Sequence, residues 1–142
     1  LETPREPTRV APNAVAWDLY TPRATTLPAH SSTRIPLAVA VDWDTVRRDT
    51  RFGAGVVYAR VNDRPALALR GLLASNAVLD AGHTGEPPVV LPTLGSGCEF
   101  LERGERVAQL VFEITILPSI PVFGVALASP TGAASASASK RT

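Results

Sequence analysis

The chain of 142 residues has a formal net charge of +1, with 45% hydrophobic and 19% charged residues. This composition is typical of one compact globular domain and excludes a disordered chain. The near-neutral charge predicts no nucleic-acid partner, and no apolar run reaches the ~18 residues that a membrane span requires. A single cysteine, Cys98, excludes an intramolecular disulfide. The N-terminus lacks the apolar core of a signal peptide, so we expect no secretion by that route.

Three segments follow one another along the chain. Residues 1–13 contain three prolines and predict an extended N-terminal arm. Residues 14–124 are a series of short apolar stretches broken by Pro, Gly and Asp, and they form the predicted folded domain. Residues 125–142 make a tail rich in Ser, Ala and Gly. Such a tail cannot build a core of its own, so we expect it to dock on a neighbouring subunit.

Within the domain, β-rich runs bounded by turn residues predict strands at residues 39–41, 56–61 and 89–91. Residues 65–75 allow one short helix at most, because a proline stands at the first position and leucines cluster behind it. Many short strands joined by Pro- and Gly-rich turns predict an all-β sandwich or barrel, of which a jelly roll is one type.

The clearest strand covers residues 107–116, where apolar residues alternate with period two. The face predicted to be buried contains Ala108, Leu110, Phe112, Ile114 and Ile116. Gln109 projects from the opposite face. This strand is therefore expected to cross the core of the domain.

A carboxylate stands in a tight turn within residues 77–86 (AVLDAGHTGE). Asp80 lies where a strand enters a bend that Gly82 and Gly85 permit. A carboxylate held there could orient a water molecule or bind a sugar hydroxyl. The residues alone favour a plainer role, in which Asp80 accepts hydrogen bonds from the backbone of its own turn.

Residues 77–86 and 103–112 (RGERVAQLVF) together resemble the third and fourth signature motifs of the trimeric dUTPase family. The resemblance implies a dUTPase-like jelly roll, or distorted β-barrel, that assembles as a homotrimer with its sites at subunit boundaries. It also implies that Asp80 contacts the deoxyribose 3′-hydroxyl and positions the attacking water. Where the family usually has a tyrosine under the sugar, this chain has His83. An exposed turn residue is an equal alternative for His83.

Residues 14–20 (AVAWDLY) resemble the first motif of the family, in which Asp18 would hold the waters of a triphosphate-bound Mg2+. A packed strand end is the alternative for this segment. Residues 63–68 (DRPALA) align with the second motif, where the family has Pro-Arg-Ser-Gly. Arg64 matches the arginine that binds phosphate, although a solvated turn is the alternative. Pro65 replaces the serine and offers neither a hydroxyl nor an N–H.

The fourth motif matches nearly residue for residue, and the resemblance assigns Gln109 to the phosphate oxygens. The fifth family motif is a Gly-rich arm with an arginine and an aromatic, whereas residues 129–142 contain no aromatic and one glycine. The fold-building signatures are therefore kept, while several that grip the triphosphate are changed. The related dCTP deaminases need a further glutamate after the hairpin, and residues 89–91 supply none.

We therefore expect a homotrimeric protein of dUTPase fold with lost or weakened catalysis and a structural or interaction role. A viral or phage accessory or capsid-surface protein would be one example, located in the cytoplasm or on a virion. The alternative is an active dUTP diphosphatase that converts dUTP to dUMP and pyrophosphate with Mg2+. A third possibility is nucleotide binding without turnover.

Overall fold

A computed structural model describes residues 3–128 and 134–136 of the chain. Its strands are β1 (Ala16–Tyr20), β2 (Thr25–Leu27), β3 (Ser32–Ile35), β4 (Val56–Asn62), β5 (Ala77–Leu79), β6 (Val89–Pro92), β7 (Glu99–Leu101), β8 (Arg106–Thr115), β9 (Ala126–Ala128) and β10 (Ala134–Ala136). Its helices are α1 (Trp43–Arg48) and α2 (Pro65–Ala68), with a 3-10 turn at Thr50–Phe52. The all-β prediction is confirmed. No helix in the described ranges is long and apolar enough to cross a bilayer.

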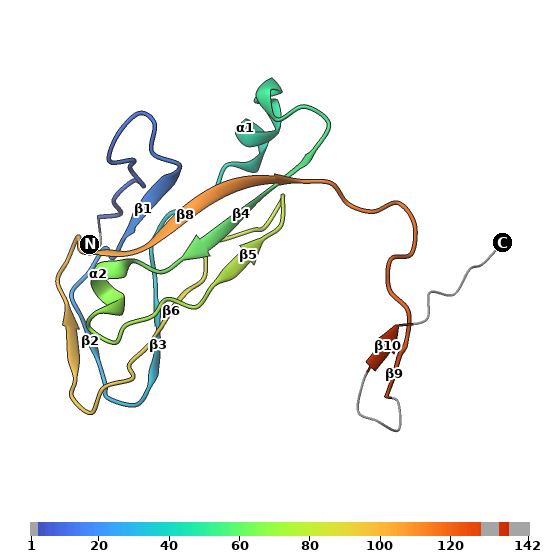
Figure 1. Ribbon diagram of the computed structural model, residues 1–142. Helices are drawn as coiled ribbons and strands as arrows, with labels where there is room; N and C mark the ends of the chain where they lie inside the picture. Colours follow the sequence, from blue (N-terminus) through green and yellow to red (C-terminus); the bar gives the residue numbers. More distant parts are fainter. Residues whose placement is uncertain (1–2, 129–133, 137–142) are drawn as a thin grey trace.

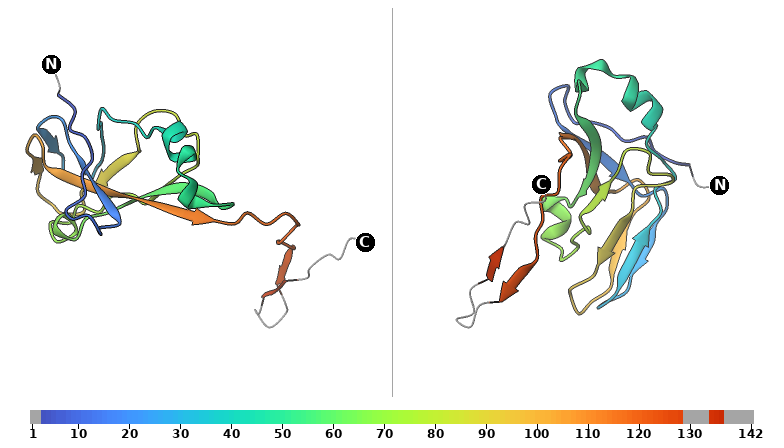
Figure 2. Two further views of the ribbon diagram at one scale, coloured as in Figure 1. Left: turned by 90° about the horizontal axis from the view of Figure 1, so that it is seen from above. Right: turned by 90° about the vertical axis from the view of Figure 1, so that its right-hand side faces the viewer.

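The body is organised around an antiparallel sheet of four strands in the order β1-β8-β4-β5 (Figure 1). Strand β8 is its spine, because it pairs with β1 on one side and with β4 on the other. The strand pairs β2–β7 and β3–β6 complete the body (Figure 2). Side chains from all these strands form one buried cluster, which includes Leu27, Ile35, Leu91, Leu101 and Leu110. Burial of these side chains stabilises the fold.

The structure contains two short helices, where the sequence predicted one at most. The predicted helix is α2, with Pro65 at its first position. The second, α1, begins after Asp42, whose side chain accepts hydrogen bonds from the backbone N–H and the hydroxyl of Thr45. These hydrogen bonds lower the pKa of Asp42 below its ordinary value. Trp43 is buried in the core and Val46 packs partly against it, and two such residues in a helix of six leave no sustained apolar period in the sequence.

The segment at residues 39–41 is not a strand, which corrects the prediction made from its β-branched residues. It joins β3 to α1 as an irregular stretch, and Ala38 just before it has a positive φ of 58°. Val39 and Val41 still pack against the core cluster. The apolar pattern of this segment therefore predicted contact with the core correctly, but it predicted the wrong backbone conformation.

Strand β8 is buried over only part of its length. Leu110 is buried, but Ile114 and Ile116 are 51% and 85% exposed, although both were predicted to be buried. Beyond β8 the chain leaves the body as an extended segment that ends in the β9–β10 hairpin (Figures 1 and 2). Within residues 3–128 and 134–136, no second layer covers that end of β8, so its apolar side chains are exposed.

The N-terminal arm folds back along β1. Thr8 and Asp18 form a backbone bridge through hydrogen bonds of 3.3 and 2.7 Å. The guanidinium of Arg5 stacks over the ring of Tyr20, with Cζ 3.8 Å from the ring centroid. Cation–π contacts of this kind add a modest attraction at exposed sites. The arm thus borders the edge of the sheet that carries Asp18.

Candidate functional site

Three polar residues lie in one row across the main sheet. Gln109 on β8 pairs with Asp18 on β1 and with Asn62 on β4. Residues directly opposite each other in antiparallel strands project to the same face, with Cβ atoms about 5 Å apart. The side-chain amide of Gln109 donates to the backbone carbonyl of Asp63 at 3.0 Å. The register of the sheet therefore brings two predicted site residues, Asp18 and Gln109, side by side.

Arg64 joins this row from just beyond the end of β4. It has an extended backbone, with φ −111° and ψ 133°, at the N-terminal boundary of α2. Its guanidinium reaches back to Asp18 and forms an ion pair with Oδ1. A second guanidinium, that of Arg106, donates to Oδ2 of Asp18 at 3.3 Å. The Asp18 side chain is only 6% exposed, so two arginines compensate a buried carboxylate.

A cationic cavity of about 410 Å³ lies beside this cluster. Its charged lining residues are Arg5, Arg64, Arg70, Arg106 and Glu105. Four guanidinium groups and one carboxylate line the cavity. Three of these guanidiniums already have carboxylate partners, since Arg64 and Arg106 pair with Asp18 and Arg70 pairs with Glu99 and Glu105. Guanidinium groups bind phosphate oxygens in bidentate fashion, so the cavity suits a polyanion.

The structure separates Asp80 and His83 from this cluster. Asp80 follows β5, which forms the opposite edge of the sheet from β1. Because β4 and β5 are antiparallel, Arg64 and Asp80 extend from opposite ends of that strand pair. Both Asp80 and His83 are exposed. One chain therefore does not bring all five predicted site residues together.

The turn that carries Asp80 has a defined shape. The backbone N–H of His83 donates to the carbonyl of Asp80 at 2.9 Å. Gly82 and Gly85 have φ values of 96° and 91°, which side chains rarely adopt, so the predicted role of these glycines is confirmed. The Asp80 carboxylate consequently stands at the rim of a tight turn, exposed to a partner or a ligand.

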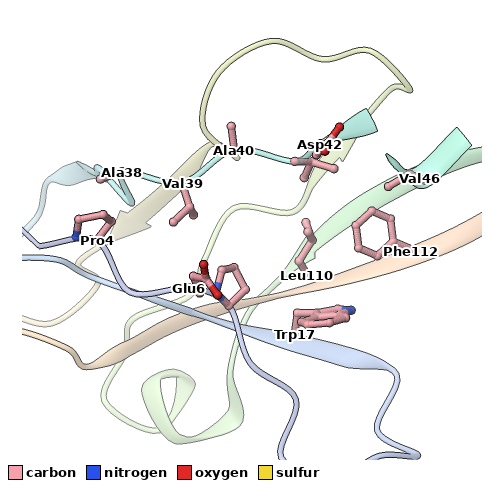
Figure 3. Close-up of a pocket in the computed structure, with 12 residues that line it drawn as sticks. Pro4, Glu6, Trp17, Ala38, Val39, Ala40, Asp42, Val46, Leu110 and Phe112 are labelled. Carbon is pink, nitrogen blue, oxygen red and sulfur yellow. The ribbon is translucent and has the colours of Figure 1, made fainter. Parts of the chain in front are cut away.

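An apolar groove of about 690 Å³ occupies the other face of the sheet (Figure 3). Trp17, Leu110 and Phe112 form its floor, while the segment 38–42 lies across from them. Trp17 and Asp18 are consecutive on a strand and so project to opposite faces. The groove is therefore separated by the sheet from the polar row.

A protein-only metal cage is not found among the described residues, where no three His, Cys, Asp or Glu side chains gather as ligands. The donor set beside the cationic cavity is one buried carboxylate, Asp18, together with neutral Gln109 and Asn62. Mg2+ commonly binds one or two protein carboxylates and completes its shell with waters and substrate phosphates. The residues present therefore fit a metal that binds together with a phosphorylated ligand.

Sequence reasoning missed three arginines of the cavity, Arg5, Arg70 and Arg106. Arg106 lies in the same recognised run as Gln109, and its position at the start of a predicted strand beside the row could have marked it. Arg70 reaches Glu99 and Glu105 through ion pairs of 3.0 and 2.7 Å. These partners are 29 and 35 residues away in the chain, so no local sequence pattern predicts the ion pairs.

Comparison with known proteins gives sequence relatives along most of the chain. The family model for dUTPase matches residues 4–129. A deoxyuridine 5′-triphosphate nucleotidohydrolase from Candida albicans is 33% identical over 112 residues, which are 75% of this chain and 62% of the relative. The protein of the same name from vaccinia virus, strain Copenhagen, is 26% identical over 117 residues, covering 82% of this chain and 72% of the relative.

Solved structures give the same answer for the fold. The dUTPase of Staphylococcus bacteriophage 80alpha aligns with a TM-score of 0.69 at 18% identity, over 83% of this chain and 88% of that one. The EIAV dUTPase aligns with a TM-score of 0.64 at 20% identity, over 84% and 91%. A variant dUTPase from phage phi11 of S. aureus, which coordinates a structural Mg(II) ion, aligns with a TM-score of 0.67 at 15% identity, over 83% and 88%. The match of the family model over residues 4–129 establishes that this chain belongs to the dUTPase family.

Proposed function

We propose that the protein is a dUTP diphosphatase, which hydrolyses dUTP to dUMP and pyrophosphate with Mg2+. Its relatives from Candida albicans and vaccinia virus are both named as dUTP nucleotidohydrolases. These relatives favour the hydrolase over the purely structural module that the altered motifs suggested. The chain spans 62% of the first relative and 72% of the second, so the proposal concerns the domain that they share with it.

The arginine-lined cavity beside Asp18 is the observation that carries the proposal. A triphosphate is a strong polyanion, and its affinity for protein depends on fixed positive charge. Arg64 lines the cavity and also touches Asp18, so it can transfer its hydrogen bonds to phosphate oxygens. Gln109, which the resemblance also assigns to phosphate, lies next to Asp18 in the row.

Asp18 is the residue of this chain that would hold Mg2+, through water molecules. The metal would neutralise charge on the triphosphate and polarise the phosphorus under attack. Because Asp18 is buried and anchored by Arg64 and Arg106, its carboxylate is fixed before substrate binds. Preorganisation of this kind avoids reorganisation at the moment of reaction.

Asp80 is the residue proposed to orient the attacking water. The new bond forms between the water oxygen and a phosphorus of the α–β bridge, while the bond from the bridging oxygen breaks and a proton is released. Since Asp80 lies away from Arg64 within one chain, a neighbouring subunit must supply it. We therefore include in the proposal a homotrimer with sites shared between subunits.

Exposed apolar side chains beyond β8 support this assembly. Residues 116–127 contain no charged side chain, and Phe123 is 94% exposed while Ile120 is 71% exposed. Large apolar side chains exposed together in one segment are typical of an interface. A second copy of the chain would cover this segment.

Two departures from the family predict a slow enzyme. Pro65 provides no donor where the family has a serine hydroxyl that contacts the oxygen between the α- and β-phosphates. His83 replaces the family tyrosine, which weakens the expected preference for deoxyribose. Loss of one preorganised donor commonly reduces kcat by ~10²–10³. Weakened rather than absent catalysis is therefore the proposed state.

The test is pyrophosphate release from dUTP by the full chain, measured with Mg2+ and with excess EDTA. We expect Mg2+-dependent turnover that falls by roughly 10² or more in Asp80→Asn. The exposed carboxylate of Asp44, which pairs with Arg47 on α1, provides the matched control Asp44→Asn, with unchanged rates. A wild-type chain that binds a non-hydrolysable dUTP analogue but releases no pyrophosphate would replace the enzyme with a nucleotide-binding protein.

A further inference from the structure

The turn that carries Asp80 is fastened to a distant segment of the chain. Its far end contains Glu86, and its middle contains His83. Glu86 contacts the stretch between β3 and α1, and the carbonyl of His83 contacts Trp43, the first residue of α1. These partners lie 40 or more residues earlier in the chain. The turn itself is exposed from Asp80 to Gly85, and these contacts link it to the body of the domain.

Glu86 holds two consecutive backbone amides with one carboxylate. Its Oε2 accepts from the N–H of Leu37 at 3.0 Å, and its Oε1 accepts from the N–H of Ala38 at 2.9 Å. Ala38 has a φ of 58°, which costs a non-glycine residue energy unless its surroundings hold it. Two charge-assisted hydrogen bonds provide that restraint, and they are stronger than bonds between neutral groups.

Trp43 provides the second link. Its indole Nε1–H donates to the backbone carbonyl of His83 at 3.1 Å. The ring is 5% exposed and stands edge-on to Phe112, with centroids 6.1 Å apart, so it is fixed by packing in the core. A rigid, buried donor therefore holds the carbonyl at the tip of an otherwise exposed turn.

We infer that Trp43 and Glu86 are positioning residues that set where Asp80 stands. This inference rests on the proposed function, in which Asp80 orients the attacking water. Asp80 is connected to these anchors through the hydrogen bond from His83 N–H to its own carbonyl. Because a displacement of about 1 Å at a reacting group can cost ~10² in rate, two such anchors matter for kcat.

The two anchors can be weakened with little change in shape. Glu86→Gln keeps the size of the side chain, but its amide nitrogen then faces a backbone N–H, donor against donor. Trp43→Phe removes the indole donor and keeps an aromatic ring in the core. Asp44→Asn, which alters an exposed carboxylate next to Trp43, is the matched control.

The first readout is independent of activity. The chain has two tryptophans, so its indole N–H signals in an NMR spectrum are assigned by the loss of one in Trp43→Phe. In Glu86→Gln we expect the Trp43 indole proton and the amides of Leu37 and Ala38 to exchange with solvent at least ~10-fold faster than in wild type. Unchanged exchange rates at all three protons would overturn the inference that Glu86 helps to hold the turn in place.

The second readout is the split between kcat and KM for dUTP, corrected for the folded fraction from a denaturation curve at the same temperature. We expect Glu86→Gln and Trp43→Phe to lower kcat by about tenfold or more, with KM within a factor of about three, because the phosphate contacts lie elsewhere. An active wild type with unchanged kcat in both variants would overturn the positioning role. An inactive wild type would overturn the proposed function. The exchange rates alone would then decide whether Glu86 and Trp43 hold the turn in place.

Discussion

Asp18 and Arg64 are 46 positions apart in the chain, yet their side chains form an ion pair between the edge strand β1 and the end of β4. Both residues were assigned separately to the triphosphate site, one to the metal waters and one to phosphate. In this structure each holds the other. Binding of Mg2+ and a triphosphate would therefore exchange one set of charge contacts for another, rather than fill bare charges.

This ion pair predicts that substitution of Asp18 lowers the stability of the protein more than substitution of Arg64. Asp18→Asn leaves the guanidiniums of Arg64 and Arg106 side by side without their shared carboxylate. We expect a loss of about 3 kcal/mol in the free energy of unfolding, as for other broken buried pairs. Arg64→Gln leaves Asp18 with Arg106 and is expected to cost about 1 kcal/mol. Urea denaturation of the two variants measures both values.

Arg47→Gln is the control for this comparison, because its pair with Asp44 is exposed and surface pairs contribute little. If Arg64→Gln proved as costly as Asp18→Asn, Arg106 would not be compensating the buried carboxylate. The Arg106 side chain is 49% exposed, which already weakens its share.

A shared site predicts rescue between two inactive proteins. Asp80→Asn and Arg64→Gln are each expected to release pyrophosphate at a small fraction of the wild-type rate. When the two variants are unfolded and refolded together, about a quarter of the sites would combine an intact Asp80 from one subunit with an intact Arg64 from another. Activity of the mixture is then well above that of either parent.

The same two variants mixed without unfolding provide the control, because assembled trimers do not exchange subunits on mixing if the interface is extensive. A mixture of Asp80→Asn with Asp80→Ala provides the second control and stays inactive. If the refolded mixture of Asp80→Asn and Arg64→Gln stays inactive while refolded wild type is active, each site is built within one chain.

The sequence predicted best the strands in which every second side chain is buried, or in which several consecutive side chains are apolar. β4 and β6 follow this rule, since Val61 and Leu91 are buried in one core. In β8, Leu110 is buried as predicted, but the consecutive residues Val107 and Ala108 are both buried. The rule fails at Ile114, because alternation describes only the strand itself. Whether a second layer covers it depends on other chain segments or on a partner, which local sequence does not encode.

The site was predicted in its members but not in its geometry. Resemblance identified Asp18, Arg64 and Gln109, and the register between β1, β8 and β4 explains why these three meet. Their meeting depends on pairings between residues up to 91 positions apart, as between Asp18 and Gln109, which no local pattern reveals. The links of Glu86 and Trp43 to other segments were missed for the same reason, because each joins residues 40 or more positions apart.

Pro65→Ser is expected to raise activity. A serine at the first position of α2 restores a hydroxyl donor next to Arg64, where proline has none. We expect kcat for dUTP to rise by about tenfold or more, since one preorganised donor is commonly worth ~10²–10³. Pro65→Ala removes the ring without adding a donor, so it separates chemistry from backbone effects. Equal gains in the alanine and serine variants would attribute the change to loop conformation instead.

His83→Tyr tests how the turn reads the sugar. Resemblance places this side chain under the ribose, where a larger phenol ring would exclude a 2′-hydroxyl. The exposed His83 ring makes one long contact, from Nε2 to the Glu86 carbonyl at 3.4 Å, so the larger side chain can be accommodated. We expect the ratio of kcat/KM for dUTP to that for UTP to rise by about tenfold or more, because steric exclusion in a shaped pocket is typically worth 10–200-fold. His83→Ala should lower the same ratio. A ratio that is identical in all three proteins would show that His83 is a turn residue with no part in sugar selection, and that another group at the subunit boundary excludes ribose.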